Sequence, residues 1–171
     1  MTKLSASRIK TAQSCSWLYH CKYKLKLPDK TNDGASRGTV CHLILEVLAK
    51  KGRKSYYNKI IKSKTIFSVP SVGRLAMIWA QKLNVADPDN VSLIDFMTVN
   101  GLEHDYFGGD LDKPTLSFSE KKFDMQINDG DKCYRINGFI DKLFLYKGKK
   151  AAIIRDFKTS KKVFEGKEVD D

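Results

Sequence analysis

The spacing of apolar and polar positions predicts helices in the first part of the chain and strands near its end. Between residues 39 and 50 the apolar residues recur in steps of three and four, as on one face of an amphipathic helix. The apolar stripe of this predicted helix is Val40, Leu43, Ile44, Val47 and Leu48. Residues 136–146 and 151–158 are instead rich in β-branched and aromatic residues, which favour strands.

The residues ahead of the amphipathic helix predict a shorter helix followed by a loop. Ser5 or Ser7 can cap a helix that runs towards His20. The aromatic residues near its end lie among lysines, and they are Trp17, Tyr19 and Tyr23. Aromatic side chains in such a setting can stack on bases, but they more often form the packing side of a short helix, and we favour packing. Residues 32–38 are expected to form a loop.

The middle third, residues 51–114, carries no chemical signature and is interpreted as a helical insert. We expect helices around residues 56–64 and 72–83. Loops are expected at Pro88, at the Gly108–Gly109 pair and at Pro114.

The loop at residues 147–150 joins the last two strands and makes their register calculable. A symmetric turn sets Tyr146 opposite Ala151. The same register sets Asp141 opposite Asp156, with Cβ atoms ~5 Å apart.

Lys158 joins this pair of acids, because side chains two residues apart share a face of a strand. On an exposed strand, an Asp-x-Lys sequence is usually a solvated pair of charges. Residues 151–154, however, have no polar face and are expected to be buried on both sides. Charges that enter such a strand need a partner or a metal, since an unpaired buried charge is very unfavourable. The hairpin therefore indicates a metal site with a resident cation.

A second hairpin brings one more acid near this face. The strand at residues 116–128 is expected to end in an Asp129–Gly130 turn, and a tight hairpin there sets Glu120 opposite Phe139. Phe139 shares a face with Asp141, so Glu120 would lie diagonal to the proposed site. A slip of one residue would move Glu120 to the other face of the sheet.

The composition is that of one domain with a basic surface. With 171 residues, 42% of them hydrophobic, the chain is long enough to bury a core. Its formal net charge of +11 favours a polyanionic partner, with nucleic acid as the first candidate and a merely soluble basic protein as the alternative. No stretch approaches the ~20 apolar residues of a membrane span, and the N-terminus lacks a signal-peptide core. We therefore expect a cytoplasmic protein with no membrane partner.

The four cysteines do not form a Cys-x-x-Cys pair, which argues against a zinc ribbon or a redox motif. They are Cys15, Cys21, Cys41 and Cys133. In a reducing compartment we expect free thiols, some of them buried.

Several short motifs occur in an order that resembles the RecB-like branch of the PD-(D/E)xK nuclease superfamily, which includes phage and CRISPR-associated exonucleases. Along the chain they are a serine-rich helical start, Gly38-x-x-x-His42, Glu120 ahead of a strand pair, Gly138-x-x-Asp141 and Asp156-x-Lys158-Thr159. The resemblance spans nearly the whole chain except residues 51–114. It implies a single nuclease domain over residues 1–171, with an α/β, restriction-endonuclease-like core in which helices flank a central mixed sheet.

The resemblance also implies the roles of individual residues. Asp141 and Asp156 would bind Mg²⁺ or Mn²⁺, helped by the backbone carbonyl of Phe157. His42 would complete the metal site from its helix, and Glu120 is a further candidate ligand. The catalytic residues would be Asp141, Asp156 and Lys158, and the lysine would orient or deprotonate the attacking water. Oxygen ligands suit hard divalent cations, which polarise a phosphoryl oxygen and lower the pKa of bound water.

The function implied is metal-dependent hydrolysis of DNA, by an exonuclease of recombination, repair or phage DNA processing in the cytoplasm of a bacterial or phage-infected cell. One alternative is a structure-selective or nicking endonuclease with the same site. The other is a DNA-binding subunit with a nuclease-like fold that depends on a partner.

The chain departs from the family pattern in two places. In relatives, a helix with a Gln-x-x-x-Tyr motif follows the Asp-x-Lys sequence, but here the chain ends at Asp171 without one. We therefore expect a protein partner or a missing C-terminal segment to complete the fold. Some relatives hold an iron–sulfur cluster with one early cysteine and three cysteines after the catalytic lysine. Cys15 matches the early position, but no cysteine follows Cys133, so we expect no cluster.

Overall fold

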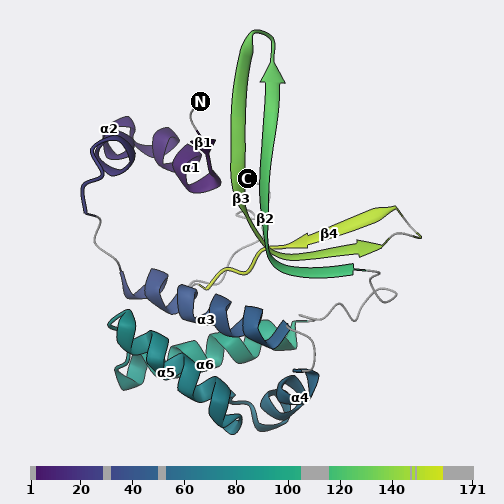
Figure 1. Cartoon of the computed structure of the whole chain (residues 1–171). Helices are drawn as coiled ribbons and strands as arrows, with labels where there is room; N and C mark the ends of the chain where they lie inside the picture. Colours follow the sequence, from purple (N-terminus) through teal and green to yellow (C-terminus); the bar gives the residue numbers. More distant parts are fainter. Residues whose placement is uncertain are drawn as a thin grey trace. The chain divides into compact units, whose positions relative to one another are not determined.

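The computed structural model describes residues 3–28, 32–49, 53–104, 116–146, 148 and 150–159 (Figure 1). The chain divides into two compact units. Unit 1 comprises Met1–Thr31 and Pro114–Arg155, and unit 2 comprises Asn32–Lys113 and Asp156–Asp171. The expectation that the whole chain acts as a single nuclease domain stays a prediction.

Unit 1 begins with a short strand and three short helical elements, which are β1 (Lys3–Leu4), α1 (Ala6–Ser14), α2 (Ser16–Tyr19) and the π-helix η1 (His20–Lys24). Ser5 caps α1, and its side chain accepts a hydrogen bond of 3.4 Å from the backbone N–H of Arg8. The predicted capping is confirmed. The predicted helix is interrupted once, at Cys15, whose sulfur caps α2.

The sheet of unit 1 is mixed, as expected, and β3 is its central strand. The longer strands are β2 (Leu116–Asp129), β3 (Lys132–Tyr146) and β4 (Ala151–Arg155). Strands β2 and β4 are antiparallel to β3, whereas β1 is parallel to it. In Figure 1, β2 and β3 form one long hairpin.

The register predicted for the last hairpin is confirmed. Tyr146 pairs with Ala151, and the ladder continues to Lys142 and Arg155. The predicted end of β4 is wrong, since the strand stops at Arg155 and residues 156–159 follow it outside the ladder.

The expected burial of β4 on both sides is also wrong. Ala151, Ala152 and Ile154 are exposed. Isoleucine favours a strand through the fit of its branched side chain to a pleated surface, so an apolar run does not by itself require two covered faces.

The register predicted for β2 and β3 is wrong by two residues. The turn is Gly130–Asp131 rather than Asp129–Gly130, and Phe139 pairs with Lys122 instead of facing Glu120. A two-residue hairpin turn requires a positive φ at its first position, and the glycine occupies that position with φ of +57°. A shift of two residues keeps every side chain on its predicted face.

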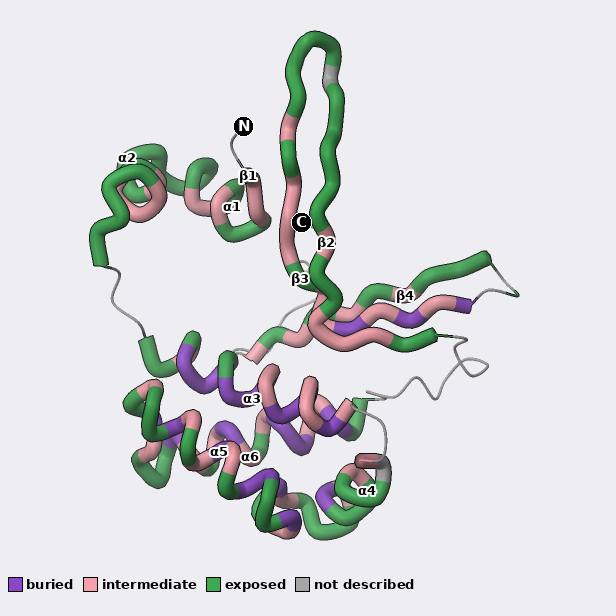
Figure 2. The backbone as a smooth tube through the Cα atoms, in the orientation of Figure 1, coloured by how far each residue is buried: buried purple, intermediate pink, exposed green. Residues whose placement is uncertain are grey.

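Unit 2 is a set of helices around an apolar core. Its elements are α3 (Asp33–Ala49), α4 (Lys54–Ser63), the 3₁₀-helix η2 (Ile66–Ser68), α5 (Pro70–Lys82) and α6 (Pro88–Glu103). Of the predicted stripe on α3, Val40, Ile44 and Leu48 are fully buried. Figure 2 shows buried positions recurring along α3, α5 and α6. The two helices expected in the middle third correspond to α4 and α5 and are confirmed.

Two segments expected to be loops begin helices instead. The side chain of Asn32 accepts a hydrogen bond of 2.7 Å from the backbone N–H of Ala35, which caps α3 well ahead of the predicted start. Asp87 caps α6 by accepting a 3.0 Å hydrogen bond from the backbone N–H of Asn90. Pro88 then occupies the first turn, where a missing N–H costs nothing.

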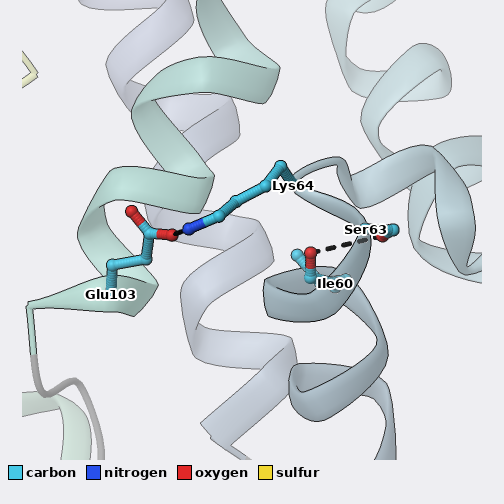
Figure 3. Close-up of polar contacts among 4 residues, drawn as sticks. All are labelled: Ile60, Ser63, Lys64 and Glu103. Carbon is cyan, nitrogen blue, oxygen red and sulfur yellow. Dashed lines mark hydrogen bonds and ion pairs between the residues drawn. The ribbon is translucent and has the colours of Figure 1, made fainter.

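An ion pair connects the end of α4 with α6 (Figure 3). Lys64 ends the helix in the left-handed conformation, with φ of +57°, and its ammonium pairs with Glu103. Ser63 donates a hydrogen bond of 3.3 Å to the carbonyl oxygen of Ile60 in the last turn. Because the lysine is open to water, the pair adds little to stability, and the apolar core holds α4 and α6 together.

All four cysteines are free thiols, as expected, with Cys15 and Cys133 exposed and Cys41 buried. Among the described residues, we find no helix both long and apolar enough to cross a membrane. The loops expected at Gly108–Gly109 and Pro114, and the tail after Thr159, lie outside the described residues.

Candidate active site

Unit 1 brings two of the predicted site residues together, Glu120 and Asp141. The ladder pairs on either side of them join Ser119 with Lys142 and Lys121 with Ile140. This register sets Glu120 directly across from Asp141 rather than diagonal to it. A carboxylate oxygen of each residue lies within 4.8 Å of the other, and both side chains are half-buried. Glu120 has φ of +50°, an uncommon conformation for a residue other than glycine.

Two carboxylates at this separation fit a divalent cation. Negative charges this close repel each other, and a cation between them turns repulsion into attraction. Oxygen donors are also the ligands that Mg²⁺ and Mn²⁺ prefer. Glu120 and Asp141 therefore form a suitable donor pair for such an ion.

Sequence reasoning missed the burial of Lys142, which follows Asp141 on β3, so that strand alternation directs the two side chains to opposite faces. Its side chain is 2% exposed, and its ammonium donates a 3.0 Å hydrogen bond to the hydroxyl of Ser119. The ammonium also lies 5.5 Å from the ring centre of Phe144. Burial lowers the pKa of Lys142 to about 8. The available signal was a lysine placed between apolar residues at alternate positions of a strand.

Unit 2 joins the histidine motif to the Asp-x-Lys segment through one contact. The Nε2 atom of His42, on α3, lies 3.1 Å from the carbonyl oxygen of Phe157. Because a carbonyl oxygen only accepts, Nε2 carries the proton when the two atoms form a hydrogen bond. The ring of Phe157 packs against the core of unit 2 and so fixes the backbone at this point.

The same separation suits two ligands of one cation. Ligands at right angles around an octahedral ion with bonds of ~2.1 Å lie about 3 Å apart. The imidazole of His42 and the carbonyl of Phe157 therefore match the predicted roles in distance as well as in chemistry.

Asp156 and Lys158 form an ion pair on either side of Phe157. Their side chains are 57% and 64% exposed, respectively. An ion pair this open to water contributes little to stability, so the segment is held by Phe157 rather than by its charges. Asp156 and Lys158 were predicted to share a face of a strand, but the strand ends at Arg155. The two charged groups are nevertheless in contact.

A pocket of about 430 Å³ lies beside these charges in unit 2. Its lining combines Asp156 and Lys158 with residues of α6 that include Phe96, Met97, Asn100 and His104. This volume is in the range of small-molecule sites. The pocket can hold a group of nucleotide size next to the ion pair.

The structure thus brings together Glu120 with Asp141 in unit 1, and His42 with Phe157 and Asp156 with Lys158 in unit 2. The facing of Asp141 and Asp156 stays a prediction, because the ladder ends one pair before them.

The comparison with protein families agrees with the fold. The family model for the PD-(D/E)XK nuclease superfamily matches residues 3–171. Comparisons with curated proteins and with solved structures found no significant match. The α/β fold with a mixed sheet is consistent with the restriction-endonuclease-like fold of that superfamily. The chain belongs to the PD-(D/E)XK nuclease superfamily.

Proposed function

We propose that this protein is a metal-dependent DNA nuclease of the RecB-like branch, and that it acts as an exonuclease. The observation that carries the proposal is the contact between His42 and Phe157, which anchors Asp156 and Lys158 to α3. Two of the motifs that define the resemblance, Gly38-x-x-x-His42 and Asp156-x-Lys158-Thr159, lie around this contact. The match to a nuclease superfamily over nearly the whole chain supports the same activity.

The cation of the proposed site is Mg²⁺ or Mn²⁺. Its ligands are Asp141, Asp156, His42 and the carbonyl of Phe157, with Glu120 as a further carboxylate. A divalent cation bound there would polarise the phosphodiester and lower the pKa of a water molecule. The donor set of carboxylates, one carbonyl and one imidazole supports this choice of metal.

Lys158 is the proposed acid–base group. Its ammonium orients the attacking water, or takes part in its deprotonation, and offsets negative charge as the phosphorane forms. The ion pair with Asp156 supports this role, because it directs the ammonium towards a carboxylate that we propose as a metal ligand.

DNA is the proposed substrate. The formal net charge of +11 favours a polyanion, and the release of counterions from DNA would drive association. We further propose that residues 1–171 work as one nuclease domain with residues 51–114 as a helical insert. The setting we propose is recombination, repair or phage DNA processing in the cytoplasm of a bacterial or phage-infected cell.

A gel assay tests this proposal with labelled linear DNA and covalently closed circular DNA, each incubated with Mn²⁺ or with EDTA. An exonuclease degrades the linear DNA but not the closed circle, and it does so with Mn²⁺ but not with EDTA. Cleavage of the closed circle would replace the exonuclease by a nicking or structure-selective endonuclease. DNA binding without cleavage under any of these conditions would reject catalysis by this chain and favour a DNA-binding subunit.

A further inference from the structure

The short helices of unit 1 present aromatic rings that the proposed nuclease site does not use. Trp17, on α2, is 69% exposed. Its ring is stacked on that of His20, with centroids 5.7 Å apart and planes 16° apart. The packing role favoured for this tryptophan from the sequence is therefore wrong. A large aromatic surface lies open to solvent.

Cationic side chains lie over a further ring of the same short helices, that of Tyr23. The guanidinium of Arg8 lies 5.0 Å from the ring centre of Tyr23, and the ammonium of Lys22 lies 5.9 Å from the same centre. Lys24 and Lys26 follow and are exposed. A polyanion bound along these short helices would therefore meet positive charge close in the sequence to Trp17.

The local backbone explains why the two stacked rings share a face. Trp17 and His20 are three residues apart, so they are neighbours on one side of the helical surface. The chain changes at His20 from α-helix to the π-helix η1. Such π-helical turns are rare and occur frequently at functional sites.

We propose that Trp17 and His20 form a nucleobase-binding site for unpaired bases of single-stranded DNA, with the neighbouring lysines near its phosphates. Every base has a π-face that stacks on an exposed aromatic ring, whatever the sequence. In a duplex these faces are already covered by neighbouring bases, so only unpaired bases are available. The site rests on the proposed function in one respect, namely that DNA is the ligand.

The chain has two tryptophans, so the fluorescence of Trp17 can report binding at the site. The Trp79→Phe variant keeps Trp17 as the sole fluorophore, and the matched Trp17→Phe variant keeps Trp79. Trp79 is partly buried on the core of unit 2 and also has a lysine, Lys82, over its ring at 4.9 Å, so it controls for nearby charge. Each variant is titrated in EDTA with a single-stranded oligonucleotide, an abasic strand of equal length and a duplex.

Stacking on Trp17 predicts strong fluorescence quenching of the Trp79→Phe variant by the single strand and much weaker quenching by the abasic strand and the duplex. Emission from Trp79 should change little with any of the three. The Trp17→Ala variant should bind the single strand about tenfold more weakly, measured by anisotropy, because one stacked base is lost. Its affinity for the duplex should match that of the unmodified protein.

Equal quenching by the abasic strand, or binding of the single strand without quenching of Trp17, would overturn the proposal. Failure of the single strand to bind at all would overturn it too. These measurements need no cleavage, so they separate the site from the nuclease. Base-dependent quenching in a protein that never cleaves DNA would keep the site and reject the proposed nuclease function. Normal cleavage without base-dependent quenching would keep the proposed nuclease function and reject the base-binding site.

Discussion

Gly38 lies so close to Thr159 that a Cβ atom on the glycine would be 2.6 Å from the threonine Oγ1. The glycine belongs to the motif on α3 that contains His42, and the threonine ends the Asp-x-Lys-Thr segment. In the middle of a helix, glycine lowers the stability of the helix by ~1 kcal/mol relative to alanine. Its presence here is explained by the approach of the segment that carries Asp156 and Lys158.

Gly38→Ala should therefore reduce activity without a matching loss of stability. The new methyl group must push Thr159 aside, and the residues just before it would move as well. Misplacement of catalytic groups by ~1 Å can lower rates by about a hundredfold. Cleavage rate and melting temperature measured on the same preparation test this expectation.

The double variant Gly38→Ala, Thr159→Ala is the control. Without Oγ1, the nearest side-chain atom of residue 159 to the new methyl group is Cβ, at 3.8 Å, which is an ordinary contact. The double variant should regain most of the lost activity. If it stayed as inactive as the single variant, the close approach would not be the cause.

His42→Ala should weaken metal binding with little loss of thermal stability. The histidine is half-buried, and its contact with the Phe157 carbonyl is worth about 1 kcal/mol as a hydrogen bond. Loss of a ligand or of its support should raise the Kd for Mn²⁺ on the order of tenfold or more. Glu46→Ala, one turn further along the same face of α3, is the matched control. A large drop in melting temperature with normal activity in the folded fraction would assign His42 to packing.

The fold was predictable where local signals were strong. The Tyr146–Ala151 register follows from the length of the connecting loop, and α4 and α5 follow from apolar periodicity. The start of α6 was not predictable from Pro88 alone, since proline serves loops and first helical turns equally well. The β2–β3 register depends on which residue of the turn is the glycine, and a shift of two residues preserves the apolar pattern.

The residue types of the candidate site could be predicted from the sequence, but the packing contacts that hold those residues could not. Asp156 and Lys158 stand out as charges after an apolar strand, and His42 is indicated by the resemblance of Gly38-x-x-x-His42 to the nuclease motif. The burial of Lys142 and the docking of Phe157 on the core of unit 2 depend on contacts between distant segments. No spacing along the chain reports such contacts.

Lys142 predicts a specific pH dependence of stability in metal-free protein. Its folded-state pKa of about 8 lies below the ordinary value of 10.5. Between these values the unfolded chain holds the proton that the folded chain has lost, so the free energy of unfolding should rise with pH through this window. Below pH 8 the buried charge destabilises the fold fully.

Urea unfolding in EDTA at pH 7, 8, 9 and 10 measures this effect. Other groups titrate in the same range, so the informative quantity is the difference between the unmodified protein and the Lys142→Met variant. The free energy of unfolding of the unmodified protein should rise relative to that of the variant as the pH rises above about 8. A difference independent of pH would show that Lys142 titrates normally.

Lys158 separates catalysis from metal binding. Lys158→Ala should keep a bound Mn²⁺, visible by calorimetry, yet lose cleavage rate on the order of 10²–10⁴-fold, as expected for an acid–base group. Lys158→Arg should be nearly as impaired, because arginine keeps the charge but not a compact, titratable amine. Wild-type rates in both variants would remove the lysine from the mechanism.

The most direct test of the account is cleavage of labelled linear DNA by the Asp156→Asn variant in the presence of Mn²⁺. The amide keeps the size of the side chain but loses the charge that would hold the cation. The account predicts a folded protein that still binds DNA with a strong salt dependence and no longer cleaves it. Unchanged turnover of this variant at saturating Mn²⁺ would contradict the proposed metal-dependent nuclease site.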